Sequence, residues 1–162
     1  MKIPEAYQNR SVYHFTPIDN LPSILAHGLL SAHEQKRLGL RQISIVWAAI
    51  QAHRAGVHVP AGPLGHVQDY VPLYFCKLSP MLLSIIGNKV VDEEAIIHFE
   101  FPIQVMEQYP MVFTDAAIMP NSNPAFYTDA ADLVHLNWEA INSPAWRMPS
   151  QDLRHARLSE LL

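Results

Sequence analysis

The 162-residue sequence predicts a single α+β domain. Its residues are 49% hydrophobic, which is enough to build one core, and 16% charged, which is too few for a disordered chain. Short apolar stretches bounded by Pro or Gly fill the middle of the sequence, whereas helical patterns cluster early and late. Strands and helices that are segregated along the chain in this way are typical of α+β proteins.

The first predicted unit is a strand followed by a helix. Residues 12–16 alternate as a short strand does, and Pro17 ends that strand. Asp19 is a suitable N-cap for a helix over residues 21–27, and Gly28 is a suitable residue to end the helix. Polar side chains are therefore expected where the strand runs into the helix.

The next part of the chain is predicted to alternate between short elements and loops. Residues 29–32 are expected to form a further short strand, and residues 35–41 a mobile polar link. Residues 44–54 fit a helix that buries Trp47 on its inner face. Residues 57–70 form a Pro/Gly-rich loop, and a loop of this length in a compact domain often has a function.

A second strand-to-helix unit follows, and a cleft is expected between the two units. Residues 71–76 fit a buried strand that stops at a Ser-Pro pair, and a helix begins near Met81. The lone Cys76 excludes an internal disulfide and fits a reducing cytoplasm. The later elements are predicted strands over residues 95–101 and 111–114, helices over 103–108, 126–134 and 138–141, and a tail over 151–162 that fits either helix or strand.

The charge distribution is uneven, although the net charge is only −4. Residues 35–68 contain no acidic side chain, and residues 90–146 contain no Lys or Arg. A basic segment beside the predicted cleft is compatible with a polyanionic ligand. Chance clustering of solvated charges explains the same pattern equally well.

Several kinds of site and segment are not indicated by the sequence. No pair among the nine His residues has metal-ligand spacing around a Glu, so no metal site is expected. The sequence has no P-loop, no dinucleotide-binding glycine pattern and no nucleophile elbow. No apolar run reaches the roughly 18 residues that span a bilayer, and the first residues lack the apolar core of a signal peptide. A cytoplasmic protein without a membrane partner is expected.

Four side chains at the ends of predicted elements are candidates for chemistry: His14, Arg54, Tyr74 and Glu160. Each also has an ordinary structural explanation. Arg54 fits the C-terminal end of a helix, where the helix dipole favours a cation, and Tyr74 fits a packed strand. Spacing alone does not connect the four residues.

Several ordered motifs resemble the DarT-type DNA ADP-ribosyltransferase toxins, which belong to the poly(ADP-ribose) polymerase-like superfamily. The motifs are Val-Tyr-His-Phe-Thr at residues 12–16, Ile-Leu-Ala-His-Gly-Leu at 24–29, Asp-Tyr-Val-Pro at 69–72, Tyr-Phe at 74–75 and Ser-Pro-Met at 79–81. The resemblance implies an ADP-ribosyltransferase-like fold, with a central split antiparallel β-sheet flanked by helices. It also implies NAD+ as co-substrate, a base in single-stranded DNA as acceptor, and a macrodomain antitoxin as partner.

The resemblance also assigns residues to roles. The catalytic pair is Arg54 and Glu160. Glu160 would stabilise positive charge on the ribose, and Arg54, which stays protonated, would contact phosphates or the base. Residues 36–54 correspond to the NAD+-covering element of the family, and residues 116–160 to its substrate-binding region. The expected NAD+ contacts are His14, Phe15, Thr16, Ser23, Ser31, Arg54 and Tyr74.

DNA contacts are expected from aromatic side chains that stack on unpaired bases and from cations that hold phosphates. The stacking candidates are Tyr127, Trp138 and Trp146, and the phosphate candidates are Arg147, Arg154 and Arg157.

The sequence departs from the family pattern at two places. A His expected soon after Phe113-Thr114-Asp115 is absent, and Ala116, Ala117 and Ile118 occupy that neighbourhood. This departure bears on the acceptor base, for which thymidine is expected ahead of guanosine. Only two residues follow Glu160, so this sequence is expected to lack the family's C-terminal end, either as a shortened piece or as a short variant with impaired activity. The strand that carries Glu160 is expected to be poorly held.

Two other functions fit parts of the sequence. One is a related enzyme that acts on RNA or protein, including the tRNA phosphotransferase type, although that type would replace Asp-Tyr-Val-Pro with basic residues. The other is a catalytically impaired module that only binds nucleic acid or protein. An NAD+ titration followed by thermal shift distinguishes this module from the enzymes.

Overall fold

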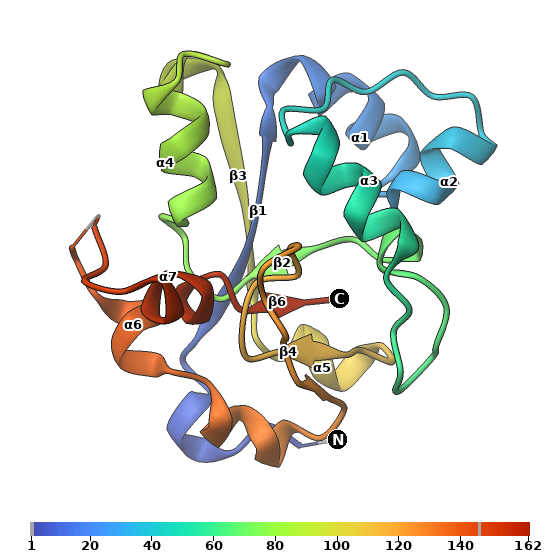
Figure 1. Cartoon of the computed structure of the whole chain (residues 1–162). Helices are drawn as coiled ribbons and strands as arrows, with labels where there is room; N and C mark the ends of the chain where they lie inside the picture. The colour runs from blue at the N-terminus through green and yellow to red at the C-terminus, as the bar shows by residue number, and fades with distance from the viewer. Residues whose placement is uncertain (1, 146) are drawn as a thin grey trace.

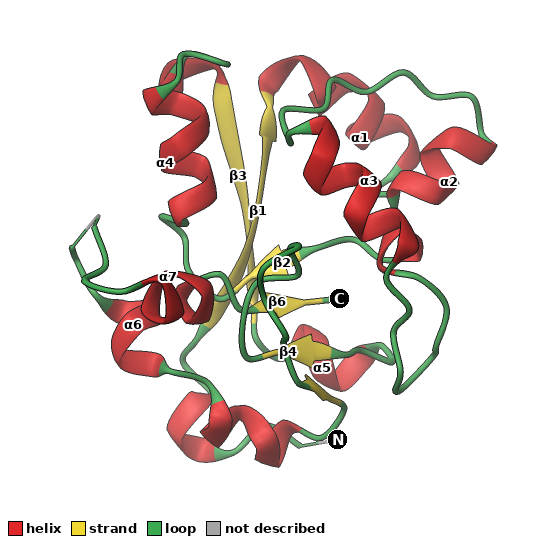
Figure 2. Cartoon of the chain, viewed as in Figure 1, coloured by secondary structure: helices red, strands yellow, loops and turns green. Residues whose placement is uncertain are grey.

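The computed structural model describes residues 2–145 and 147–162. Helices flank one sheet whose neighbouring strands are all antiparallel, as the sequence and the resemblance predict (Figures 1 and 2). The six strands are β1 (Ser11–Pro17), β2 (Leu73–Tyr74), β3 (Ile96–Pro102), β4 (Phe113–Thr114), β5 (Phe126–Tyr127) and β6 (Glu160–Leu161), and they lie in the order β3-β1-β2-β6-β4-β5.

Helices cover both sides of the long β1–β3 pair, with the first three helices on one side and the fourth on the other (Figure 1). The α-helices are α1 (Leu21–His27), α2 (Ala32–Arg37), α3 (Ala48–Gly56), α4 (Pro80–Gly87), α5 (Val105–Gln108), α6 (Trp138–Asn142) and α7 (Gln151–Arg157). Short 3-10 helices are η1 (Glu5–Tyr7), η2 (Ile18–Asn20), η3 (Val67–Asp69), η4 (Glu93–Ala95) and η5 (Ala130–His135).

Strand β1 is paired along its whole length on one side only. β3 pairs with every residue from Ser11 to Pro17, whereas β2 pairs with β1 at Tyr13 alone. Among the described residues, no strand therefore pairs with the second side of β1 from His14 onward. A cavity opens beside this free edge.

Local sequence signals explain where the helices start and end. Ser79 and Ser150 cap α4 and α7, because each hydroxyl accepts a backbone hydrogen bond at 3.2 Å from the residue three positions later. Pro80 occupies the first turn of α4, where a missing N–H costs nothing. Gly28 ends α1 with φ +84°, a conformation that favours glycine. The predicted boundaries at Met81 and Gly28 are confirmed to within a residue.

Strand β6 is well held, contrary to the expectation from the sequence. Leu161 is fully buried and pairs with Leu73 of β2 on one side and Phe113 of β4 on the other. Leu162 and Val112 exchange two backbone hydrogen bonds, at 2.7 and 3.1 Å. A central place in the sheet thus fixes a strand that is only two residues long.

Other local predictions are wrong for identifiable reasons. Residues 29–32 do not form a strand, because Ser31 caps α2, and α2 also takes up part of the predicted mobile link. Asp19 belongs to η2, so the N-cap of α1 is Asn20. The predicted helix over 126–134 is β5 followed by η5. Trp47 is 50% exposed rather than buried, because α3 begins only after it.

Within the described residues, no helix combines the length and the apolar character needed to cross a membrane.

Candidate active site

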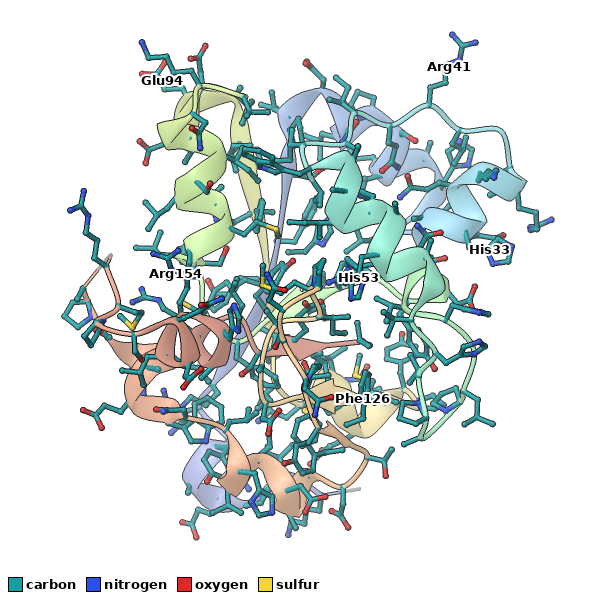
Figure 3. All side chains as sticks on the ribbon, in the orientation of Figure 1. His33, Arg41, His53, Glu94, Phe126 and Arg154 are labelled. Carbon is teal, nitrogen blue, oxygen red and sulfur yellow. The ribbon has the colours of Figure 1, made fainter. Side chains whose placement is uncertain are left out.

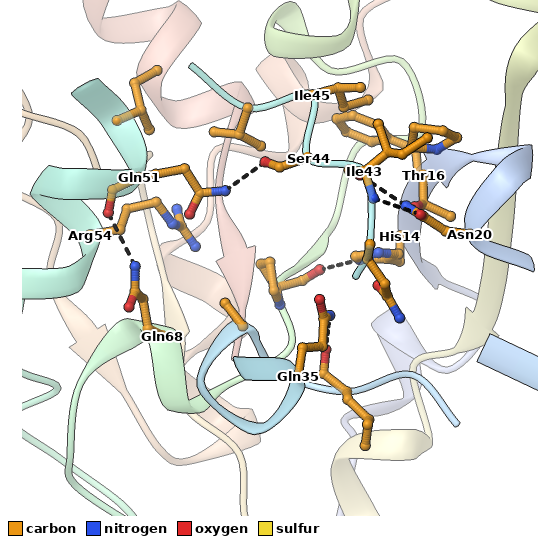
Figure 4. Close-up of a pocket in the computed structure, with 18 of the residues that line it drawn as sticks. His14, Thr16, Asn20, Gln35, Ile43, Ser44, Ile45, Gln51, Arg54 and Gln68 are labelled. Atoms are coloured by element: carbon orange, nitrogen blue, oxygen red, sulfur yellow. Dashed lines mark hydrogen bonds between the residues drawn. The ribbon is translucent and has the colours of Figure 1, made fainter. Parts of the chain in front are cut away.

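Two cavities of about 200 and 190 Å³ lie on either side of a shared wall. The shared wall is made of Ile50 and Arg54 of α3, Tyr74 of β2 and Met81 of α4. The first cavity extends along the free end of β1 and below the segment that joins α2 to α3 (Figure 4). The second cavity lies between α4, α7 and residues 117–119.

Arg54 and Glu160 form a buried ion pair at this wall, although 106 positions separate them in sequence. Nη1 of Arg54 donates to Oε1 of Glu160 at 2.8 Å, and Nη2 donates to Oε2 at 2.7 Å. The Ile118 backbone N–H donates to the same Oε1 at 3.2 Å. The two side chains are 11% and 3% exposed, so the carboxylate is held in one orientation by three donors.

The charge state of this pair follows from its surroundings. Burial alone would lower the pKa of Arg54, but the charge and hydrogen bonds of Glu160 outweigh burial and raise that pKa above its ordinary value. Burial raises the pKa of Tyr74, and the nearby charge of Glu160 raises it further. Arg54 is therefore a permanent cation and Tyr74 a neutral phenol at physiological pH.

Tyr74 is positioned by the sheet and by an aromatic neighbour. It lies opposite Glu160 in the β2–β6 register. Its ring stacks on Phe15 of β1, with centroids 5.7 Å apart and planes inclined by 24°. Both rings line the first cavity, so its wall presents an aromatic surface next to the ion pair.

His14 and Thr16 supply hydrogen-bonding groups to the first cavity. Nδ1 of His14 lies 2.9 Å from the backbone oxygen of Pro72. A carbonyl oxygen can only accept, so Nδ1 carries the hydrogen and Nε2 is left as an acceptor. The Thr16 Oγ1 accepts from Asn20 at 2.9 Å and keeps its own hydrogen available to donate.

His14 should make the folded protein sensitive to mild acid. Burial lowers its pKa below the ordinary 6.5, so the folded state disfavours the imidazolium that the unfolded chain forms readily. The stabilisation is therefore complete above pH 6.5 and is lost as the pH falls below it. Denaturant unfolding at pH 7.5 and at pH 5.5 measures the free energy of unfolding. Between these two pH values, that free energy should fall more for wild type than for His14→Gln. His98, whose pKa burial also lowers, calls for a parallel His98→Gln series. Equal losses in wild type and His14→Gln would contradict the prediction.

The other predicted NAD+ contacts do not line either of the two cavities. The Ser23 hydroxyl accepts at 3.4 Å from Gln42, which does line the first cavity. Ser31 caps α2 by accepting from the Glu34 backbone N–H, and it borders a separate hollow with Asp69.

The predicted DNA contacts fall into different environments. Arg147 and Arg154 are exposed, and Arg154 of α7 borders the second cavity (Figure 3). Arg157 is only 3% exposed, because its guanidinium donates to Cys76 Sγ and to the backbone oxygens of Leu78 and Ala145. The expectation that Arg157 binds phosphate is therefore wrong, since its donors are used to hold the end of α7.

Trp138 and Tyr127, two of the aromatic candidates for base stacking, line neither of the two cavities. Trp138 stacks on Tyr7 at 5.1 Å and lies under the guanidinium of Arg10. Tyr127 stacks on Phe113 at 5.3 Å. Trp146 lies outside the described residues.

Sequence reasoning missed several residues that line the cavities. Trp47 borders the second cavity, and its half-exposed ring was expected in the core. Asn20, Gln51 and Gln68 line the first cavity; Gln51 donates to Ser44 at 3.1 Å, and its backbone oxygen accepts from Gln68 at 3.3 Å. The one sequence signal for Asn20 is its position as a polar residue shortly after Pro17, where the predicted strand ends. Over residues 2–145 and 147–162, no cluster of three or more His, Cys, Asp or Glu side chains could hold a metal ion.

Known proteins resemble this chain over almost its whole length. A family model described as "ssDNA thymidine ADP-ribosyltransferase, DarT" matches residues 13–162. The DNA ADP-ribosyl transferase of Thermus sp. (strain 2.9) is 38% identical over 156 residues, which are 93% of this chain and 73% of that protein. The DNA ADP-ribosyl transferase of Escherichia coli O127:H6 is 28% identical over 151 residues, which are 90% of this chain and 68% of that protein.

Solved structures of the Thermus sp. 2.9 protein share the fold. Its complex with ADP-ribosylated ssDNA gives a TM-score of 0.82 at 35% identity, over 99% of this chain and 76% of that one. Its complex with NAD+ gives a TM-score of 0.79 at the same identity and coverage. On the combined strength of the fold, the family match and these relatives, the chain belongs to the DarT family of DNA ADP-ribosyltransferases.

Proposed function

We propose that this chain, an NAD+-dependent DNA ADP-ribosyltransferase by family, transfers ADP-ribose to thymidine in single-stranded DNA. The observation that carries the proposal is that Arg54 lines both cavities and is ion-paired with the buried Glu160, which lines the second. Direct transfer from donor to acceptor requires the leaving group and the incoming base to be held together on opposite faces of the reacting carbon. Two cavities that share one charged wall meet this requirement.

In this proposal the first cavity takes NAD+. Nε2 of His14 accepts from a ribose hydroxyl, and the Thr16 hydroxyl donates to a second polar group of the cofactor. The nicotinamide ring stacks against the pair of Phe15 and Tyr74, which places the bond to be cleaved beside Glu160.

The reaction breaks the bond between the ribose carbon and the nicotinamide nitrogen, and the electron pair leaves with neutral nicotinamide. Glu160 stabilises the positive charge that develops on the ribose, and its three donors keep the carboxylate in place before the charge forms. A ring nitrogen of the base then forms the new bond to carbon and loses its proton. Arg54 is already protonated and cannot accept that proton, so the proton passes to the carboxylate of Glu160. The guanidinium stabilises negative charge on the base.

The second cavity takes the acceptor base. Its walls are mainly apolar, formed by Met81, Ala117 and Met119, and they suit a base that carries a methyl group. Trp47 offers a half-exposed ring for stacking, and Arg154 offers a cation for a phosphate or a base oxygen. Ala117 stands in the region where the family pattern places a His, so guanosine is the alternative acceptor to test.

Trp47→Ala and Arg154→Ala are expected to weaken DNA use without affecting NAD+ use. Loss of a base stack is worth about 1–3 kcal/mol, so the KM for an oligonucleotide should rise roughly tenfold or more in Trp47→Ala. The logarithm of the DNA-binding constant falls linearly with the logarithm of salt concentration, and Arg154→Ala should make this slope shallower by about 0.7. Steady-state kinetics across a salt series would measure both.

Matched controls keep this test specific. Tyr109 is an aromatic residue that is 60% exposed and borders a different hollow, and Lys89 is an exposed cation in the turn after α4. Tyr109→Ala and Lys89→Ala should behave as wild type. If the two control variants lose as much DNA affinity as the two cavity variants, the second cavity is not the acceptor site.

We also infer that the chain is a single ADP-ribosyltransferase domain that acts in the cytoplasm as the toxin of a toxin–antitoxin pair. One sheet and its helices carry the whole proposed site, and DNA and NAD+ meet in the cytoplasm. The family resemblance supports a macrodomain antitoxin that removes ADP-ribose from DNA. Growth arrest on expression, prevented by co-expression of a macrodomain hydrolase or by Glu160→Gln, is the expected result.

The direct test is mass spectrometry of single-stranded oligonucleotides incubated with the protein and NAD+. Four oligonucleotides should each contain one kind of base within an otherwise abasic tract. Gain of one ADP-ribose by the thymidine oligonucleotide alone would support the proposal, and gain by the guanosine oligonucleotide would replace thymidine with guanosine. Modification of RNA or protein in place of all four oligonucleotides would overturn the proposed acceptor.

A further inference from the structure

Residues 38–47, called the strap here, join α2 to α3 and contribute to both cavities. Residues 42–46 line the first cavity, and the next residue, Trp47, borders the second. The strap is the continuous piece of chain that leads from the proposed NAD+ site to the proposed DNA site. Figure 4 shows its central part lying across the first cavity.

The strap buries little of its own apolar surface. Leu38 is 45% exposed, Ile43 52% and Trp47 50%, while Ile45 is buried. Arg41 points away from the protein (Figure 3). Hydrophobic burial therefore holds the strap in place at few points, and its polar contacts decide where it lies.

Asn20 makes the strongest polar contact with the strap. Its Oδ1 accepts from the Ile43 backbone N–H at 2.8 Å, and its Nδ2 donates to the Ile43 backbone oxygen at 2.9 Å. Among the described residues, no other side chain bonds to the backbone of residues 38–47. The contacts made by strap side chains are longer, at 3.4 Å from Gln42 to Ser23 and 3.1 Å from Gln51 to Ser44.

Asn20 is itself fixed to the NAD+-facing end of β1. It is only 4% exposed, and its Nδ2 also donates to Thr16 Oγ1 at 2.9 Å. The amide thus uses both hydrogens and its oxygen, so it has a single favourable orientation. One buried side chain links Thr16, on the floor of the cavity, to Ile43, on its cover.

We propose that Asn20 is a positioning residue that fixes the strap over the NAD+ site and thereby places Trp47 at the acceptor site. This proposal rests on the proposed function for the identity of the two ligands. It makes NAD+ binding and DNA binding cooperative, because a ligand under residues 42–46 restricts the same segment that ends at Trp47. By linkage, each ligand must raise the affinity for the other by the same factor.

The first test is the kinetics of Asn20→Ala. Of the three hydrogen bonds that this variant loses, two hold the strap. Loss of those two corresponds to roughly a tenfold effect, so we expect the KM for NAD+ and the KM for the oligonucleotide each to rise about tenfold. The value of kcat should change by less than about threefold, since Arg54 and Glu160 are untouched. Asn88→Ala, at an exposed Asn after α4, should behave as wild type.

Limited trypsin digestion without NAD+ reports on how firmly the strap is held. Its result would not change if Asn20→Ala lost only a direct contact with NAD+. Arg41 lies in the strap, and Lys89 lies in an exposed turn after α4 as an internal control. Without NAD+, Asn20→Ala should be cut after Arg41 several times faster than wild type, with cleavage after Lys89 unchanged. Carba-NAD+ should protect Arg41 strongly in wild type and weakly in the variant.

Ile43→Pro keeps the proposal testable if Asn20→Ala fails to fold. Proline lacks the N–H that Ile43 donates to Asn20. Ile43 is exposed, so the substitution leaves the core unchanged. It should reproduce both the kinetic and the trypsin results. The proposal would be overturned if trypsin cut Asn20→Ala and Ile43→Pro after Arg41 at the wild-type rate. It would also be overturned if the KM for NAD+ rose while the KM for the oligonucleotide stayed unchanged. Failure of every oligonucleotide to gain ADP-ribose would instead overturn the proposed function, while the trypsin assay would still test Asn20.

Discussion

Glu160→Gln is expected to reduce ADP-ribose transfer at least about 10³-fold, and also to lower the free energy of unfolding, because the buried Arg54 cation loses its counter-charge. The amide keeps the shape of the side chain but removes the negative charge that would stabilise the ribose as nicotinamide leaves. Loss of a preorganised electrostatic contact at a reacting centre costs roughly 3–4 kcal/mol, which is a factor of 10²–10³, and loss of the proton acceptor adds to it. Turnover is measured by mass spectrometry of the oligonucleotide, and binding by NAD+ titration.

A matched control is available on the surface. Glu139 of α6 is exposed and borders neither of the two cavities, so Glu139→Gln should retain wild-type turnover. NAD+ affinity in Glu160→Gln should stay within several-fold of wild type, because the proposed NAD+ contacts at His14 and Thr16 remain. Transfer within tenfold of wild type would remove Glu160 from the catalytic role.

Arg54→Met is expected to lower both stability and turnover. It leaves the carboxylate of Glu160, only 3% exposed, without its bidentate partner, and breaking a buried pair in this way costs roughly 3–5 kcal/mol of unfolding free energy. Transfer should fall as well, since the carboxylate loses its orientation and the base loses its stabilising cation. Denaturant unfolding and oligonucleotide turnover measure the two effects separately.

The double variant Arg54→Met/Glu160→Leu distinguishes a structural pair from a catalytic one. Replacing both charges with apolar groups removes the unpaired charge, so much of the lost stability should return, while transfer stays absent. Arg37→Met, which breaks an exposed pair with Glu34, serves as the control and should leave the unfolding midpoint unchanged. If the double variant is as unstable as Arg54→Met, packing rather than charge determines how much this wall contributes to stability.

Local patterns in the sequence predicted much of the scaffold. The strand before Pro17, the end of α1 at Gly28 and the start of α4 after Ser79 each depend on residues only a few positions apart. Steric limits at Pro, the freedom of Gly at positive φ and hydroxyl capping act over such short ranges. The ordered motifs identified the family for the same reason, because they are read directly along the chain.

Contacts between distant segments decided the rest. Glu160 meets Arg54 only because β6 is inserted between β2 and β4, and the same insertion holds a strand that looked too short to be stable. Arg157 is buried because Cys76 and Leu78 lie beside it, although its sequence neighbours resemble a surface helix. Asn20 holds the strap at Ile43, 23 residues away, by pairing with its backbone, which no side-chain pattern records.

The sequence by itself determined the fold class, the family and the chemical groups available for the reaction. The tertiary structure alone decided which of those groups share a wall, which cations stay exposed and which segment covers the first cavity. The physical reason is that helix capping, turns and strand alternation are local, whereas the burial of a charge or an amide depends on strand order, which brings together residues from opposite ends of the chain.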